Sequence, residues 1–186
     1  MLDEGAARQI HEASLALLES PGVRLEHDDI VARLRRAGAR PGIGPQVVRF
    51  PPELVSEAIR LAPARVLLAD RQGSGRYLEP AGTSQIWTAP GMHIVRHGQH
   101  RLATRADLAA LARLVGQLPS VDGIVGMSLA DTPPRAADFV GLRVMAQNTR
   151  KHLRVLSTTP EGAEAVSQMR DVGGSQPWVS MGFTAH

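Results

Sequence analysis

Small polar side chains follow three short apolar segments in the last third of the chain. With Trp87 added, the candidates for substrate binding are Trp87, Met127, Asp131, Ser157, Thr158 and His186. Hydroxyl, carboxylate and imidazole groups can hold a polar ligand or move a proton. An indole ring such as that of Trp87 can contact a quaternary ammonium, although it also suits ordinary core packing.

Several of these residues have an equally good structural explanation. Asp131 and Thr132 precede a predicted helix and can cap it, and Thr159 can cap the next one. His186 is the final residue of the sequence, so its neighbours indicate nothing about its setting. Binding and capping therefore both stay open, and the sequence identifies no catalytic residue.

Metal and phosphate sites are the other chemistry that the residue types suggest. His93, His97 and His100 are close in sequence, but the glycines around them predict a hairpin with His97–His100 as its turn. Metal ligation would favour a helical pair four residues apart, so we expect exposed turn histidines and no metal site. Thr158–Pro160 lies before a predicted helix, where a phosphate group could bind. One interpretation of the sequence is therefore an unrelated α/β enzyme with a phosphate site.

The polar residues are positioned by an alternating series of elements. The apolar segments Val121–Gly126, Leu153–Ser157 and Trp178–Phe183 are separated by helical patterns over Pro134–Asn148 and Pro160–Val172. This order predicts an α/β protein with parallel strands and helices packed on the sheet. A closed (β/α)₈ barrel needs about 250 residues, so the series predicts only the opening units of such a barrel.

The earlier part of the chain has a different pattern. Apolar residues recur at helical spacing over Glu4–Glu19, about Asp28–Ala37, and Pro51–Ala62. Short strands are predicted at Val47–Phe50, Val66–Ala69, Ile86–Thr88 and His93–Arg96. Thr104–Asp107 has a capping-box pattern that begins a helix to about Gln117. We expect a helical and small β-rich α+β region over residues 1–103 and the first β/α units of an incomplete TIM barrel over residues 104–186.

Composition narrows the class of protein. The 43% of hydrophobic residues can build a core, and 21% of charged residues argues against disorder. The net charge of +3 comes from arginines scattered beside acids, with Lys151 the single lysine, so no nucleic-acid surface is predicted. Cysteine is absent, which excludes disulfides and thiolate sites. Without a signal-peptide pattern or a membrane-length apolar run, we expect a cytoplasmic protein that does not contact membranes.

Six short blocks, taken in order, carry a family resemblance. They are Ile10–Leu15, Ala37–Ala39 with Val48–Val55, Arg101–Leu108, Asp131–Pro134, Asn148–Lys151 and Thr159–Gly162. Together they resemble the N-terminal portion of the trimethylamine methyltransferase family. That family includes pyrrolysine-containing trimethylamine enzymes and non-pyrrolysine relatives such as glycine betaine methyltransferases.

The resemblance implies a TIM barrel with N-terminal additions. It implies methyl transfer from a tertiary or quaternary amine to the cobalt of a corrinoid that a cognate partner protein presents, so this chain binds no cofactor directly. We expect the chain by itself to be a truncated, inactive fragment. The alternative is a non-catalytic binding or assembly module, in which the edge of the last strand pairs with a partner chain that supplies the rest of the barrel, or forms a homo-oligomer.

Overall fold

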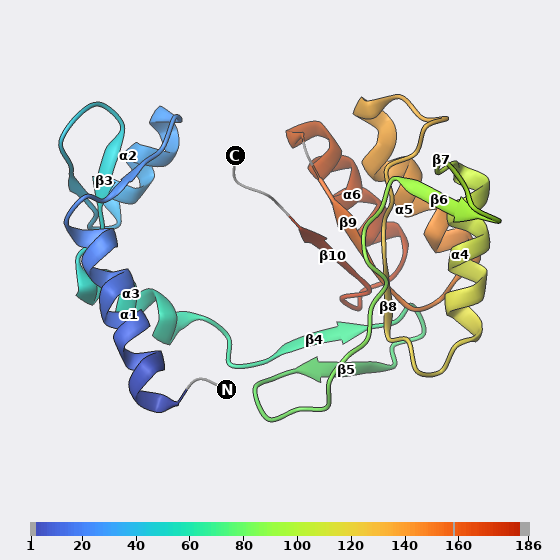
Figure 1. Cartoon of the computed structure of the whole chain (residues 1–186), viewed down its shortest axis with the longest axis horizontal. Coiled ribbons are helices and arrows are strands. Elements are labelled where there is room, and N and C mark those ends of the chain that lie inside the picture. The colour runs from blue at the N-terminus through green and yellow to red at the C-terminus, as the bar shows by residue number, and fades with distance from the viewer. Residues whose placement is uncertain (1–2, 158, 183–186) are drawn as a thin grey trace. The chain divides into compact units, whose positions relative to one another are not determined.

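The chain folds into two compact units, Met1–Pro63 and Ala64–His186, in a computed structural model (Figure 1). The structure describes residues 3–157 and 159–182, so the predicted binding residues Thr158 and His186 lie outside the described residues. The sequence predicted a boundary after residue 103 instead. Residues 64–103 fold with the second unit because the Ala69 N–H donates to the Pro177 carbonyl oxygen and the Asp122 N–H to that of Ile86.

The first unit combines three helices with a three-stranded sheet. Its elements are α1 (Glu4–Glu19), β1 (Val23–Arg24), α2 (Asp28–Arg36), β2 (Arg40–Pro41), β3 (Val47–Arg49) and α3 (Pro52–Leu61). The central β3 is antiparallel to both β1 and β2. Val31, Ala39 and Val48 form the small core. The three predicted helices are confirmed. Pro52 is the first residue of α3, where a backbone N–H would have no partner within the helix, so proline loses no hydrogen bond there.

Two hairpins open the second unit. β4 (Val66–Ala69) pairs with β5 (Gly75–Leu78), and β6 (His93–Arg96) pairs with β7 (Gln99–Leu102). The sequence predicted β4 and β6 but not β5. The second turn is shorter than predicted, since only His97 and Gly98 lie between the strands, with φ of 51° and 76°. Two positive φ values are typical of tight two-residue hairpin turns.

An alternating series of helices and strands completes the second unit. Its elements are α4 (Arg105–Gln117), β8 (Gly123–Val125), a 3₁₀ turn η1 (Pro134–Ala136), α5 (Ala137–Asn148), β9 (His152–Leu156), α6 (Pro160–Val172) and β10 (Val179–Gly182). The three strands form a parallel sheet, as the sequence predicted, and β9 lies in its centre. They do not close into a barrel within the part of the chain that the structure describes.

The prediction of a strand at Ile86–Thr88 is wrong. This segment forms only an isolated bridge between Trp87 and Gly123, at the beginning of β8. The Trp87 ring lies over Gly123, where an added Cβ would come within 2.5 Å of the indole.

The core of the second unit explains why α5 is apolar on most sides. This helix packs against α4, α6 and β9, and its Leu142 and Met145 are fully buried. Leu108 from α4 and Ile124 from β8 join the same cluster. Each such side chain contributes on the order of 1.5–3 kcal/mol when fully buried. No helix within the described residues combines the length and the apolar character that a membrane crossing requires.

Candidate functional site

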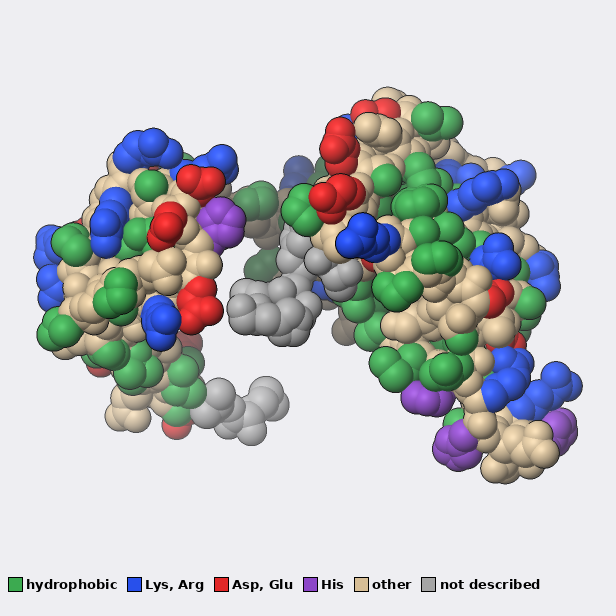
Figure 2. All heavy atoms as spheres, turned by 90° about the horizontal axis from the view of Figure 1, so that it is seen from above, with side chains coloured by type: hydrophobic (Ala, Val, Ile, Leu, Met, Phe, Trp, Pro, Cys, Tyr) green, Lys and Arg blue, Asp and Glu red, His purple; other side chains and the backbone are tan. Residues whose placement is uncertain are grey.

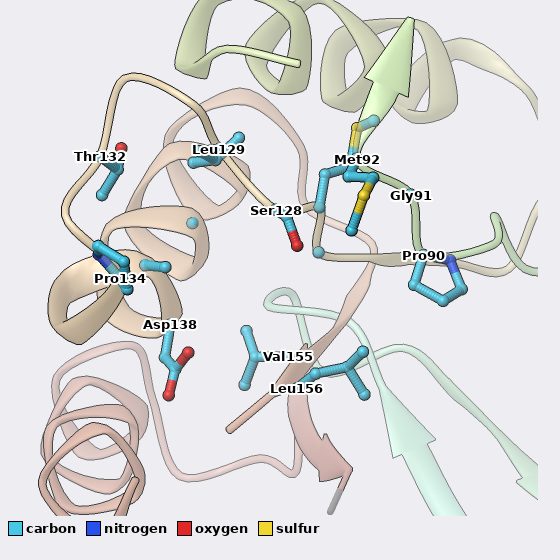
Figure 3. Close-up of a pocket in the computed structure, with 14 residues that line it drawn as sticks. Pro90, Gly91, Met92, Ser128, Leu129, Thr132, Pro134, Asp138, Val155 and Leu156 are labelled. Atoms are coloured by element: carbon cyan, nitrogen blue, oxygen red, sulfur yellow. The ribbon is translucent and has the colours of Figure 1, made fainter. Parts of the chain in front are cut away.

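A cavity of about 640 Å³ lies at the carboxyl ends of β8 and β9. We call it the carboxyl-end cavity, and the lining residues that matter below are Met92, Met127, Ser128, Thr132, Asp138 and Leu156. They come from the segment before β6, the loop after β8, the first turn of α5 and the end of β9 (Figure 3). This volume is in the range of small-molecule sites.

Most of the lining is apolar. Met92, Met127, Val155 and Leu156 contribute thioether and aliphatic groups, and Met92 and Leu156 are 52% and 44% exposed. Figure 2, viewed from the end to which β8, β9 and β10 point, shows hydrophobic side chains gathered on this face of the second unit. An apolar cavity with a few placed polar groups is typical of a small-molecule site.

Asp138 is the charged residue of this lining. Its Oδ2 accepts a 2.8 Å hydrogen bond from the hydroxyl of Ser157, a residue that is only 6% exposed. The same oxygen lies beside Gly162 of α6, where an added Cβ would be 2.3 Å away. The absence of a side chain at residue 162 therefore leaves room for the carboxylate, and the Ser157 hydroxyl, which is also 3.1 Å from the Thr159 carbonyl oxygen, helps to hold it.

Two hydroxyl groups complete the polar part of the cavity. The Ser128 hydroxyl points into the open space in Figure 3. Thr132 is 9% exposed, and its Oγ1 has no hydrogen-bond partner among the described residues. A buried hydroxyl normally has a partner, so a ligand or water is needed to satisfy this one.

Asp131, a predicted binding residue, does not line the cavity. Its carboxylate accepts from the backbone N–H of Arg105 at 3.0 Å and from the Arg105 Nε at 3.1 Å. Burial alone would raise the pKa of Asp131, but the hydrogen bonds from Arg105 outweigh it and hold the pKa below its usual value. Asp131 thus stabilises the start of α4, not the following helix that the sequence suggested. Thr159, by contrast, does cap α6, since its side chain accepts from the Gly162 N–H.

Trp87 lies at the opposite end of the strands. Its ring contacts His152 edge-on, with 5.2 Å between ring centroids. Both line a second cavity of about 230 Å³ at the amino ends of β8 and β9, together with Gln85, Asp122 and Lys151. We call this the amino-end cavity. Trp87 therefore lies in the wall of a different cavity from Met127.

Several polar groups of the amino-end cavity bind the protein itself, but the buried Gln85 Nε2 and His152 Nε2 have no hydrogen-bond partner among the described residues. Lys151 Nζ donates to the carbonyl oxygens of Leu118 and Val121. His152, 3% exposed, is bonded through Nδ1 to the carbonyl oxygen of Ala69 at 2.9 Å. A carbonyl only accepts, so Nδ1 carries the hydrogen. Burial lowers the pKa of His152, and the bond to Ala69 only partly opposes this effect.

Two of the residues predicted to bind substrate lie at or next to the carboxyl-end cavity. Met127 lines the carboxyl-end cavity, and Ser157 touches it through Asp138. Asp138 itself was missed. The available signal was an acidic residue near the start of a helix that is otherwise largely apolar.

A comparison with protein families places the chain among known proteins. The model described as trimethylamine methyltransferase (MTTB) matches residues 1–178. This chain belongs to the trimethylamine methyltransferase family. The family resemblance that the sequence blocks indicated is thereby confirmed.

Individual members of the trimethylamine methyltransferase family show the same likeness. Trimethylamine methyltransferase MttB of Desulfitobacterium hafniense is 28% identical over 148 residues, covering 77% of this chain and 30% of that protein. MttB1 and MttB2 of Methanosarcina mazei are 24% and 25% identical over 165 and 173 residues. These matches cover 84% and 89% of this chain, but 33% and 34% of those proteins. The chain thus spans about a third of the length of the curated relatives it matches.

Proposed function

We propose that this chain forms the first β/α units of a methyltransferase barrel and holds part of its amine-binding site. The observation that carries the proposal is the carboxyl-end cavity. Parallel β/α proteins bind ligands beyond the carboxyl ends of their strands, and this cavity lies there in a chain of the trimethylamine methyltransferase family. The outer edge of β10 also supports it, because no described strand pairs with that edge.

The proposed substrate is a tertiary or quaternary methylated amine. Its methyl groups would contact the thioethers of Met92 and Met127 and the aliphatic groups of Leu156. The described lining contains no aromatic ring, so a positive charge would be balanced by the Asp138 carboxylate instead. The role of this chain would be to hold the amine in one orientation and to exclude water.

The proposed methyl acceptor is a corrinoid carried by a separate protein. When bound, the corrinoid supplies a nucleophilic cobalt that accepts the methyl group, while the bonding electron pair stays on the amine nitrogen. No histidine lines the carboxyl-end cavity within the described residues, so the cavity offers no imidazole ligand for cobalt. We propose that a partner protein holds the corrinoid and brings it to the mouth of the cavity.

Binding of a simple methylated ammonium tests the proposal directly. The 186-residue chain is titrated with tetramethylammonium, and backbone amide shifts are followed by NMR. We expect the largest shifts at Met127, Ser128 and Thr132. The absence of binding, or shifts confined to the amino-end cavity, would contradict the proposal.

The proposed need for further barrel units has its own test. The chain spans about a third of its relatives, so we expect no methyl transfer from trimethylamine to free or protein-bound cob(I)amide. Robust turnover by this chain alone would refute that part of the proposal.

A non-catalytic assembly module is the second candidate function. The observation in its favour is the outer edge of β10, whose backbone groups can pair with another chain. Size-exclusion chromatography with light scattering would then give a small complex of defined mass. A monomer that binds tetramethylammonium would favour the methyltransferase interpretation.

A further inference from the structure

Two buried nitrogen atoms of the amino-end cavity, His152 Nε2 and Gln85 Nε2, have no hydrogen-bond partner among the described residues. The His152 ring is bonded to Ala69 through Nδ1, which carries the hydrogen, so Nε2 offers a lone pair and accepts. The amide nitrogen of Gln85 can only donate. Buried polar groups rarely lack a partner, so the two atoms together indicate a ligand that donates to one and accepts from the other.

The charged side chains of the amino-end cavity already have partners. Asp122 pairs with Arg76 at 3.3 Å, and Lys151 Nζ donates to two backbone carbonyl oxygens. Asp70 Oδ1 accepts from two backbone N–H groups in its own turn. The two acids and two bases of the described lining therefore balance one another, and a charged ligand would have to be desolvated without a free counter-charge. This arrangement favours a neutral ligand.

The size and the apolar part of the amino-end cavity narrow the ligand further. Leu68, Trp87, Pro119 and Val121 contribute aliphatic and aromatic groups to the lining. The volume of about 230 Å³ is just below the range of drug-sized sites and suits a molecule of about ten non-hydrogen atoms. A primary carboxamide combines an N–H donor with a carbonyl acceptor and carries no charge. A carboxamide on a small apolar group therefore matches the donor, the acceptor and the apolar lining together.

We propose that the amino-end cavity is a second binding site, which takes a small neutral molecule with a carboxamide group attached to an apolar part. The amide N–H of the ligand donates to His152 Nε2, and its carbonyl oxygen accepts from Gln85 Nε2. This inference does not depend on the proposed function, because the two cavities lie at opposite ends of β8 and β9 and share no lining residue.

The test is a titration of the 186-residue chain with three related probes, followed by backbone amide shifts in NMR. Benzamide has the donor, the acceptor and an apolar ring; N,N-dimethylbenzamide lacks the N–H; benzoate lacks it and adds a charge. We expect benzamide to shift the amides of Gln85, Trp87 and His152, and to bind at least about 10-fold more tightly than either of the other probes. No binding of benzamide, or equal binding of all three, would overturn the inference.

Two variants assign the binding to the two nitrogen atoms. Gln85→Met removes the amide at similar length, and His152→Asn removes Nε2 but can still donate to Ala69. Each should weaken benzamide binding at least about 10-fold, whereas His100→Asn on the exposed β6–β7 hairpin should not. Unchanged benzamide affinity in folded Gln85→Met would refute the inference. Thermal unfolding without probe identifies a folding defect, and if neither variant folds, the comparison of the three probes on the wild type decides.

Discussion

The two cavities of the second unit lie at opposite ends of the same two strands, and their polar groups do different things. In the amino-end cavity, Asp122 accepts from the Ile86 N–H at 2.8 Å and pairs with Arg76 at 3.3 Å. Lys151 and His152 bind backbone carbonyls there. In the carboxyl-end cavity, one carboxylate and two hydroxyls border apolar groups.

The second unit therefore has polar groups that mainly stabilise the fold at one end of its strands and polar groups that border open space at the other. At the amino ends, Asp122, Lys151 and His152 bond loops and strands to one another, which stabilises the fold, while Gln85 Nε2 and His152 Nε2 are left without a partner among the described residues. At the carboxyl ends, the polar groups are fewer and border open space, which suits a ligand. β/α proteins commonly separate the two tasks in this way. We therefore expect substitutions at the two ends of the strands to affect stability and amine binding differently.

The largest expected effect is at Trp87. Trp87→Ala removes a ring that packs on Gly123 and His152, and we expect the free energy of unfolding to fall by about 3 kcal/mol, measured by urea denaturation. Tetramethylammonium affinity should change less than twofold under conditions where the variant is folded. A large loss of affinity in the folded variant would indicate that Trp87 belongs to the amine site. It would contradict the assignment of amine binding to the carboxyl-end cavity alone.

The next effect is at the contact between α5 and α6. Gly162→Ala would place a Cβ 2.3 Å from Asp138 Oδ2, so the carboxylate must move, and we expect a loss of about 2 kcal/mol with weaker tetramethylammonium binding. Gly141→Ala on α5 is the matched control for stability only, because Gly141 also lines the carboxyl-end cavity. Its Cβ meets nothing closer than 3.9 Å, so the better helix propensity of alanine should give up to about 1 kcal/mol of stability. Equal effects of the two variants would contradict the proposed packing.

A smaller effect is expected at Ser157. Ser157→Ala removes a hydroxyl that bonds both Asp138 and the Thr159 carbonyl oxygen, and should cost about 1 kcal/mol in thermal or urea unfolding. Tetramethylammonium should bind a few-fold more weakly, since the carboxylate is no longer fixed. Ser14→Ala on the exposed face of α1 should change stability by less than about 0.5 kcal/mol. If Ser157→Ala binds tetramethylammonium as tightly as the wild type, the hydrogen bond from Ser157 to Asp138 does not contribute to binding.

The smallest effect concerns pH and the amino-end cavity. Burial lowers the pKa of His152 in the folded protein, so below about pH 6.5 the unfolded chain binds a proton that the folded protein does not. Stability should therefore fall as the pH drops from about 6.5 toward the lower folded pKa. His152→Asn, which can still donate to Ala69, should flatten this dependence, whereas His100→Asn on the exposed hairpin should not. If the stability of the wild type and of His152→Asn depends on pH in the same way, groups other than His152 cause that dependence.

The sequence allowed correct prediction wherever short-range rules decide the structure. Helical spacing gave α1, and the capping box is formed as predicted, with Asp107 bonded to the Thr104 N–H. The bond from Arg101 and then that from Thr104 hold the pKa of Asp107 well below its usual range. The β5 strand was missed because Gly75–Leu78 carries no alternating pattern and pairs only once β4 lies beside it.

The amino-acid order by itself determined the main helices, the parallel strands of the last third and the family, because spacing, caps and short blocks are local properties of the chain. Only the tertiary structure decided which acid faces the cavity and at which end Trp87 lies. Asp131 and Asp138 are similar in sequence context, but Arg105 binds the first, while the packing of α5 on β9 brings the second to Ser157. Such choices depend on contacts between residues distant in sequence, and no local pattern encodes them.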